Sequence, residues 1–123
     1  MDDLLFWLYF STSVLLINHE IDSAYWKEWE LFKLPGGIAG FLLIHFPLLI
    51  LILYGLILVH THSLSGQVFS LILCFGGVFA FGIHTYFLKK GRSQFDKVIS
   101  KVILALILIA SLAQLAVTIY LMI

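Results

Sequence analysis

The chain has 123 residues, of which 62% are hydrophobic and only 11% are charged. A soluble domain carries about half apolar and about a quarter charged residues, so this composition excludes an ordinary soluble protein and indicates a membrane protein. The formal net charge is zero, which leaves a nucleic-acid partner without electrostatic support.

Four apolar segments follow one another along the chain, and a helix needs about 20 residues to cross the hydrocarbon core. The first apolar run, residues 4–17, is short, so we expect its helix to continue past Asn18 to about Ala24. Its start, Met1-Asp2-Asp3, is acidic, unlike the basic start of a signal peptide. The sequence therefore predicts an all-α fold with a single domain. This domain is a four-helix transmembrane bundle with spans at about 4–24, 38–59, 67–88 and 102–123.

The basic residues predict the orientation of this bundle. All seven lie in the first and third connections or at the span ends beside them: Lys27, Lys33, Lys89, Lys90, Arg92, Lys97 and Lys101. By the positive-inside rule both connections face the cytoplasm, which leaves both termini on the non-cytoplasmic side. We therefore expect a multi-pass protein of a bacterial cytoplasmic (inner) membrane with membrane lipids as partners.

Three histidines are expected at a similar depth in the membrane. His19, His45 and His84 belong to three different predicted spans, each about 7 to 10 Å along the axis from the cytoplasmic end. Polar residues at such depth are costly, and they usually face the bundle interior and pair with one another. The histidines therefore predict a polar centre near the cytoplasmic face.

Acidic residues near the end of the first span are candidate partners for these histidines. On a continuous helix Asp22 shares the face of His19, together with Trp26 and Glu30, whereas Glu20 is rotated by about 100°. Imidazole with carboxylate suits zinc or iron. The predicted metal ligands are His19, Asp22, His45 and His84, and Glu20, Glu28 and Glu30 are further members of the polar centre.

Other functions remain open for the same residues. A histidine beside a carboxylate is also suited to proton transfer on a lipid-like substrate. Alternatively, the cluster only sets helix register in a non-enzymatic interaction or scaffold protein. A third possible function is that of a transporter built as a homo-oligomer. The candidate ligand is a small apolar molecule, and no spacing rule on one helix identifies the chemistry.

The stretch YWKEWELF, which follows the first span, has the composition of an interfacial segment. Tryptophan is enriched at the membrane surface, where the ring is apolar and the indole N–H remains wet. Trp26 and Trp29 are therefore predicted to anchor the segment at headgroup level, and their neighbouring charges are predicted to lie in water.

The residues NHEIDSAYWKEWELF, followed by GGIAGFLLIHFPLL, resemble a group of small bacterial four-span membrane proteins of unknown function. The matching positions are His19, Glu20, Glu28, Trp29 and His45. The resemblance implies a four-span fold and a membrane location, and it implies no established activity. The sequence does not resemble membrane desaturases, because their His-x-x-x-His and His-x-x-His-His boxes are absent.

Overall fold

Helices account for the regular structure, and no strand occurs in residues 1–92 and 96–123, which are the residues that the computed structural model describes. The long helices are α1 (Asp2–Tyr25), α3 (Gly37–His60), α4 (Leu64–Lys89) and α5 (Val98–Met122). Between α1 and α3 lies the single-turn helix α2 (Glu28–Leu31). The predicted all-α fold with four long helices is confirmed.

The long helices match the thickness of a bilayer. Each has 24 to 26 residues, which corresponds to about 36 to 39 Å and exceeds the ~30 Å of the hydrocarbon core. All four are apolar enough to cross a membrane. Large apolar side chains also cover the outside of the bundle, among them Leu43, Phe46, Phe75 and Ile109. The chain is therefore a multi-pass membrane protein.

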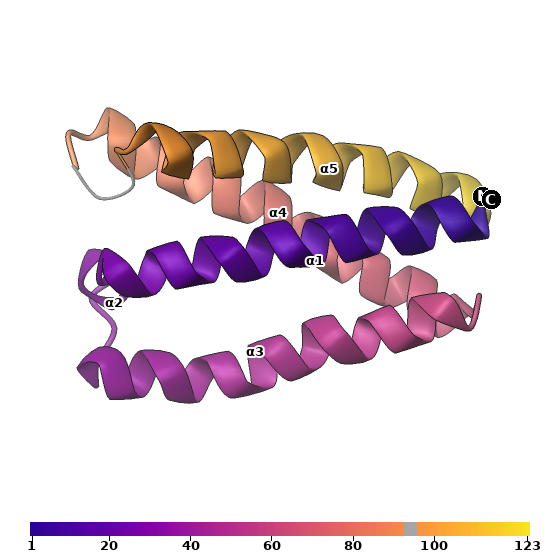
Figure 1. Cartoon of the computed structure of the whole chain (residues 1–123), viewed down its shortest axis with the longest axis horizontal. Coiled ribbons are helices and arrows are strands. Elements are labelled where there is room, and N and C mark those ends of the chain that lie inside the picture. The colour runs from indigo at the N-terminus through magenta and orange to yellow at the C-terminus, as the bar shows by residue number, and fades with distance from the viewer. Residues whose placement is uncertain (93–95) are drawn as a thin grey trace.

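Helices α1 and α4 form the middle of the bundle. Both contact α3 and α5, and they also contact each other. Helices α3 and α5 lie on opposite sides of this central pair, as Figure 1 shows. The central pair therefore separates α3 from α5.

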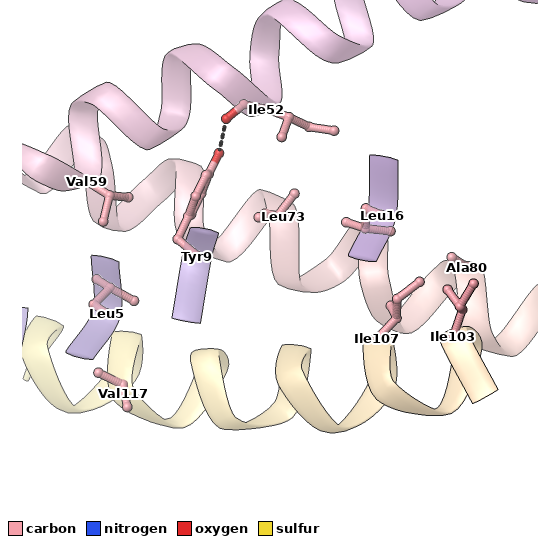
Figure 2. Close-up of a cluster of buried hydrophobic side chains, with 10 residues drawn as sticks. All are labelled: Leu5, Tyr9, Leu16, Ile52, Val59, Leu73, Ala80, Ile103, Ile107 and Val117. Atoms are coloured by element: carbon pink, nitrogen blue, oxygen red, sulfur yellow. Dashed lines mark hydrogen bonds between the residues drawn. The ribbon is translucent and has the colours of Figure 1, made fainter. Parts of the chain in front are cut away.

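The apolar core runs along the inner faces of the long helices, and Tyr9 in α1 gives it a polar link to α3 (Figure 2). The Tyr9 hydroxyl donates a hydrogen bond of 2.8 Å to the Ile52 carbonyl oxygen. A Cβ atom added at Gly55 would lie only 2.0 Å from this hydroxyl. The absence of a side chain at Gly55 thus gives Tyr9 the room to reach the α3 backbone.

A second polar contact joins α4 to α5 in the half of the bundle near the chain termini. Gln114 Nε2 donates to Ser70 Oγ at 2.8 Å and to the Ser70 carbonyl oxygen at 3.2 Å. Ser70 Oγ and Thr118 Oγ1 form a further hydrogen bond of 2.7 Å. All three side chains are fully buried, so these bonds satisfy polar groups that would otherwise be costly in the membrane interior.

The two ends of the bundle differ in charge. Both termini lie at one end, and α2 and the α4–α5 connection lie at the other (Figure 1). Lys27 and Lys33 flank α2, and Lys89, Lys90 and Arg92 stand at the end of α4. We call this the basic end.

The connection that contains α2 packs onto the basic end of the bundle. Lys27 and Lys33 adopt left-handed backbone conformations at φ 55° and φ 56°, so the chain turns sharply on both sides of α2. Leu31 is buried, and the Trp29 ring lies 5.4 Å from the Phe41 ring of α3. Phe32 packs against Phe87 of α4, with ring centroids 5.6 Å apart. The segment therefore covers the end of the helices.

Candidate metal centre

His84 is held in one orientation by the backbone of its own helix. Its Nδ1 atom lies 2.8 Å from the Ala80 carbonyl oxygen. A carbonyl oxygen only accepts, so Nδ1 carries a proton and Nε2 is the ring nitrogen that faces Glu28. Nε2 lies 3.8 Å from Glu28 Oε1. A backbone acceptor that fixes the tautomer in this way is typical of histidines that ligate metals through the other nitrogen.

His19 of α1 meets His84 in the interior of the bundle. The two side chains are 1% and 2% exposed. Their rings are perpendicular, with centroids 4.5 Å apart. Two imidazoles from non-adjacent helices thus converge at one buried point.

Glu28 brings a carboxylate to the same point from α2. Its side chain is only 13% exposed, although it follows directly after the exposed Lys27. Its Oε2 atom is buried and has no hydrogen-bond partner in the described part of the chain. The left-handed conformation of Lys27 turns the backbone so that Glu28 points inward.

Together these residues form a group with the chemistry and spacing of a metal site. His19, Glu28 and His84 each offer one ligand atom, and these atoms all lie within 4.8 Å of one another. A tetrahedral ion bonded at ~2.1 Å holds its ligand atoms about 3.4 Å apart, so side-chain shifts of an ångström or so close the site. Imidazole nitrogen and carboxylate oxygen are ligand types that bind transition metals in proteins.

Comparison with known proteins places the chain in a family. Residues 5–121 match the model described as "Family of unknown function (DUF6713)". The chain belongs to this family. The predicted resemblance to a small family of uncharacterised membrane proteins is thereby confirmed. No curated protein and no solved structure gives a significant match to the chain.

In this DUF6713 member, a second histidine and carboxylate pair lies close to the group of His19, Glu28 and His84. His45 Nε2 is 2.5 Å from Glu20 Oε2, and His45 Nδ1 is 2.7 Å from the Phe41 carbonyl oxygen. The carbonyl again requires the proton on Nδ1, so Nε2 and the Glu20 carboxyl group share one further proton. The Phe41 ring lies over the imidazole, with centroids 3.9 Å apart. This pair is arranged to hold a proton.

A cavity of about 350 Å³ connects these groups. Its polar lining consists of His19, Glu20, Glu28 and His84, joined by Tyr9 farther along α1. The remaining walls are apolar and come from α1, α3 and α4: Leu16, Leu48, Leu51, Ile52, Phe69, Ile72, Leu73, Gly76, Phe79, Ala80 and Ile83. A concave apolar site with a few convergent polar groups is the usual form of a small-molecule site.

The residues predicted as metal ligands are divided between two places. His19 and His84 lie together with Glu28 in the three-residue group, whereas His45 bonds to Glu20. Asp22 is half-buried, and neither it nor His45 is a member of the three-residue group found in the described chain. Glu28 supplies the carboxylate of this group.

The end of α1 determines which of the acidic residues beyond it points inward. The shared face of His19, Asp22, Trp26 and Glu30 requires an unbroken helix, but α1 ends at Tyr25 and Lys27 is left-handed. The helical phase is therefore reset, so that Glu30 is exposed and Glu28 points inward. Trp26 and Trp29 are both half-buried in this turn, and their role as membrane anchors stays a prediction.

Proposed function

We propose that this protein binds a divalent transition metal, zinc or iron, through His19, Glu28 and His84. The metal would stand at the polar end of the cavity, where it acts on a lipid-like small molecule. The observation that carries the proposal is the convergence of three buried ligand atoms from α1, α2 and α4 within 4.8 Å. Such a costly arrangement in a membrane interior is most readily explained by a bound ligand.

The ligand set favours zinc or iron over other metals. Two imidazoles and one carboxylate form a set that holds catalytic zinc in a tetrahedral site, and the same set holds non-haem Fe(II) on one face of an octahedron. Calcium and magnesium prefer oxygen ligands. Three protein ligands also leave at least one coordination position for an atom of a bound molecule. This open position is what suits the centre to chemistry on a ligand in the cavity.

The charge distribution supports an orientation in a bacterial cytoplasmic membrane. The basic end with Lys27, Lys33, Lys89, Lys90 and Arg92 would face the cytoplasm, and both termini would face outward. The metal centre would then lie near the cytoplasmic face. Cysteines introduced at Ser63 and Lys97 test this arrangement: an impermeant thiol reagent added to intact cells should label position 63 and not position 97. The reverse labelling would overturn it.

Metal content is the direct test of the centre. The purified protein is loaded with zinc, or with Fe(II) without oxygen, and unbound metal is removed before elemental analysis. We expect about one metal per chain in the wild type. His19→Ala and His84→Ala should lose it, because each removes one of three ligands.

Two histidines provide matched controls for this experiment. His45→Ala should keep the metal because His45 bonds to Glu20, and His62→Ala should keep it because His62 lies in the loop at the opposite end. Each variant is accepted only if its helical circular dichroism equals that of the wild type. A folded wild type that binds neither zinc nor iron would overturn the proposal. The cluster would then be structural, as in an interaction or scaffold protein.

A further inference from the structure

The cavity extends along α1 from the proposed metal centre to beyond the midpoint of the helix. Along α1 its lining runs from Glu20 and His19 to Tyr9, a separation of about ten residues or ~15 Å of helix. This distance is half of the ~30 Å hydrocarbon core. The Tyr9 hydroxyl, bonded to the Ile52 carbonyl oxygen of α3, stands at the far end of this run on α1. The length of the cavity thus equals about half the thickness of the hydrocarbon core, and its far end lies beyond the midpoint of α1.

The apolar walls of the cavity are continuous with the outer surface of the bundle. Leu48 and Leu51 of α3, and Ile72 and Phe79 of α4, line the cavity and are also exposed. Because these parts of α3 and α4 lie in membrane-spanning segments, their exposed surface contacts lipid chains. A molecule therefore enters between α3 and α4 from the hydrocarbon layer, and it is itself apolar over most of its length.

The charge at the polar end selects the head of this molecule. This step rests on the proposed metal: a divalent ion with neutral His19 and His84 and ionised Glu28 has a net charge of about +1. Glu20 and His45 share one proton, so their pair adds no net charge. An uncompensated charge is costly in a dry site. A single negative charge on the ligand balances it.

From these three observations we propose that the cavity binds a long-chain monocarboxylate, a fatty acid in its ionised form. The carboxylate occupies the open coordination position of the metal beside His19, Glu28 and His84. The hydrocarbon chain of the fatty acid runs between α3 and α4 toward Tyr9. Its contacts with membrane lipid are replaced by contacts with the cavity walls. A long-chain alcohol has the same chain without the charge, and acetate has the same head without the chain, so both bind more weakly.

Cobalt(II) makes the first coordination sphere visible. The protein in phosphatidylcholine nanodiscs is loaded with Co(II), and its visible absorption is followed during titration with palmitate, hexadecanol or acetate. We expect palmitate to change the cobalt spectrum in a saturable manner. Acetate should require at least a tenfold higher concentration, and hexadecanol should leave the spectrum unchanged.

Two glycines of α4 provide a matched pair of variants for the chain. A Cβ atom at Gly76 or at Gly82 has no neighbouring atom within 4 Å, so a side chain is accommodated at either position. Only Gly76 lines the cavity. Gly76→Phe should therefore weaken the palmitate response at least tenfold and keep the cobalt, whereas Gly82→Phe should resemble the wild type.

The outcomes separate this inference from the metal proposal. If cobalt binds and palmitate leaves its spectrum unchanged, the carboxylate inference is wrong and the metal centre stands. An equal response to hexadecanol, or an unchanged palmitate response in Gly76→Phe, would also overturn the inference. If neither cobalt nor zinc binds the folded wild type, both proposals fail together.

Discussion

The two halves of the bundle use buried polar side chains in opposite ways. Toward the termini, Gln114, Ser70 and Thr118 bond directly to one another across the α4–α5 contact. Toward the basic end, His19, Glu28 and His84 converge at the end of a cavity. Both sets are buried, so burial alone does not distinguish a packing contact from a candidate site.

The two sets of polar side chains differ in the proportion of their groups that donate hydrogen bonds and the proportion that accept them. Hydroxyl and amide groups both donate and accept, so Ser70, Gln114 and Thr118 bond to one another, although Gln114 Oε1 has no hydrogen-bond partner in the described residues. The carboxylate of Glu28 only accepts when ionised, and its buried Oε2 atom has no hydrogen-bond partner in the described residues. A buried carboxylate beside two imidazoles is suited to a cation. A ligand site in a membrane interior is therefore indicated by buried charged acceptors that lack matching donors, more than by polarity alone.

The largest expected effect is metal-dependent stability at the basic end. Zinc at a free concentration 100 times its dissociation constant should raise the free energy of unfolding by about 2.7 kcal/mol, because it binds the folded chain alone. Thermal unfolding in detergent with and without zinc measures this change. Glu28→Gln, which keeps the shape and removes the charge, should reduce the zinc effect strongly.

Ser70→Ala supplies the control from the other half of the bundle. It should lower the stability of the protein by itself and leave the zinc-dependent increase intact. Equal zinc effects in the wild type and Glu28→Gln would contradict the assignment of Glu28 as a ligand. The two halves would then no longer differ in their response to metal.

A smaller effect is expected at two neighbouring glycines of α4. Gly76 lines the cavity, whereas Gly77 faces α5. A Cβ atom at Gly77 would lie 2.0 Å from Ser111 Oγ, whereas one at Gly76 meets no atom within 4 Å. Gly77→Ala should therefore destabilise the protein by about 2 kcal/mol through overpacking of the α4–α5 contact. Gly76→Ala should be neutral or slightly stabilising, because alanine favours a helix. Similar unfolding temperatures for the two variants would show that α4 and α5 are not closely packed at Gly77.

The smallest effect concerns the hydrogen bond between Gln114 and Ser70. A double-mutant cycle with Gln114→Ala and Ser70→Ala should give a coupling energy of about 1 kcal/mol, as is usual for side-chain bonds between membrane helices. Metal content should stay at the wild-type value in all three variants. A loss of metal in either single variant would mean that the two halves are coupled, and it would weaken the division drawn between them.

Much of the fold and the depth of the site are predictable from the sequence. The number of long helices follows from the apolar runs, because the bilayer sets how long an apolar segment has to be. The depth of His19 and His84 follows from their distance to the span ends, because a helix rises by a constant amount per residue. Both residues do lie in the buried group near the basic end.

Only the tertiary structure decided which carboxylate joins these histidines. Helical periodicity favoured Asp22 and Glu30, but the chain turns after Tyr25, and the left-handed Lys27 directs Glu28 inward and leaves Glu30 exposed. His45 has the depth of a ligand, yet its rotation on α3 pairs it with Glu20. Depth along one helix is a local property that the sequence determines. The meeting of side chains from separate segments depends on how the helices rotate and where the chain turns, and no local spacing records that.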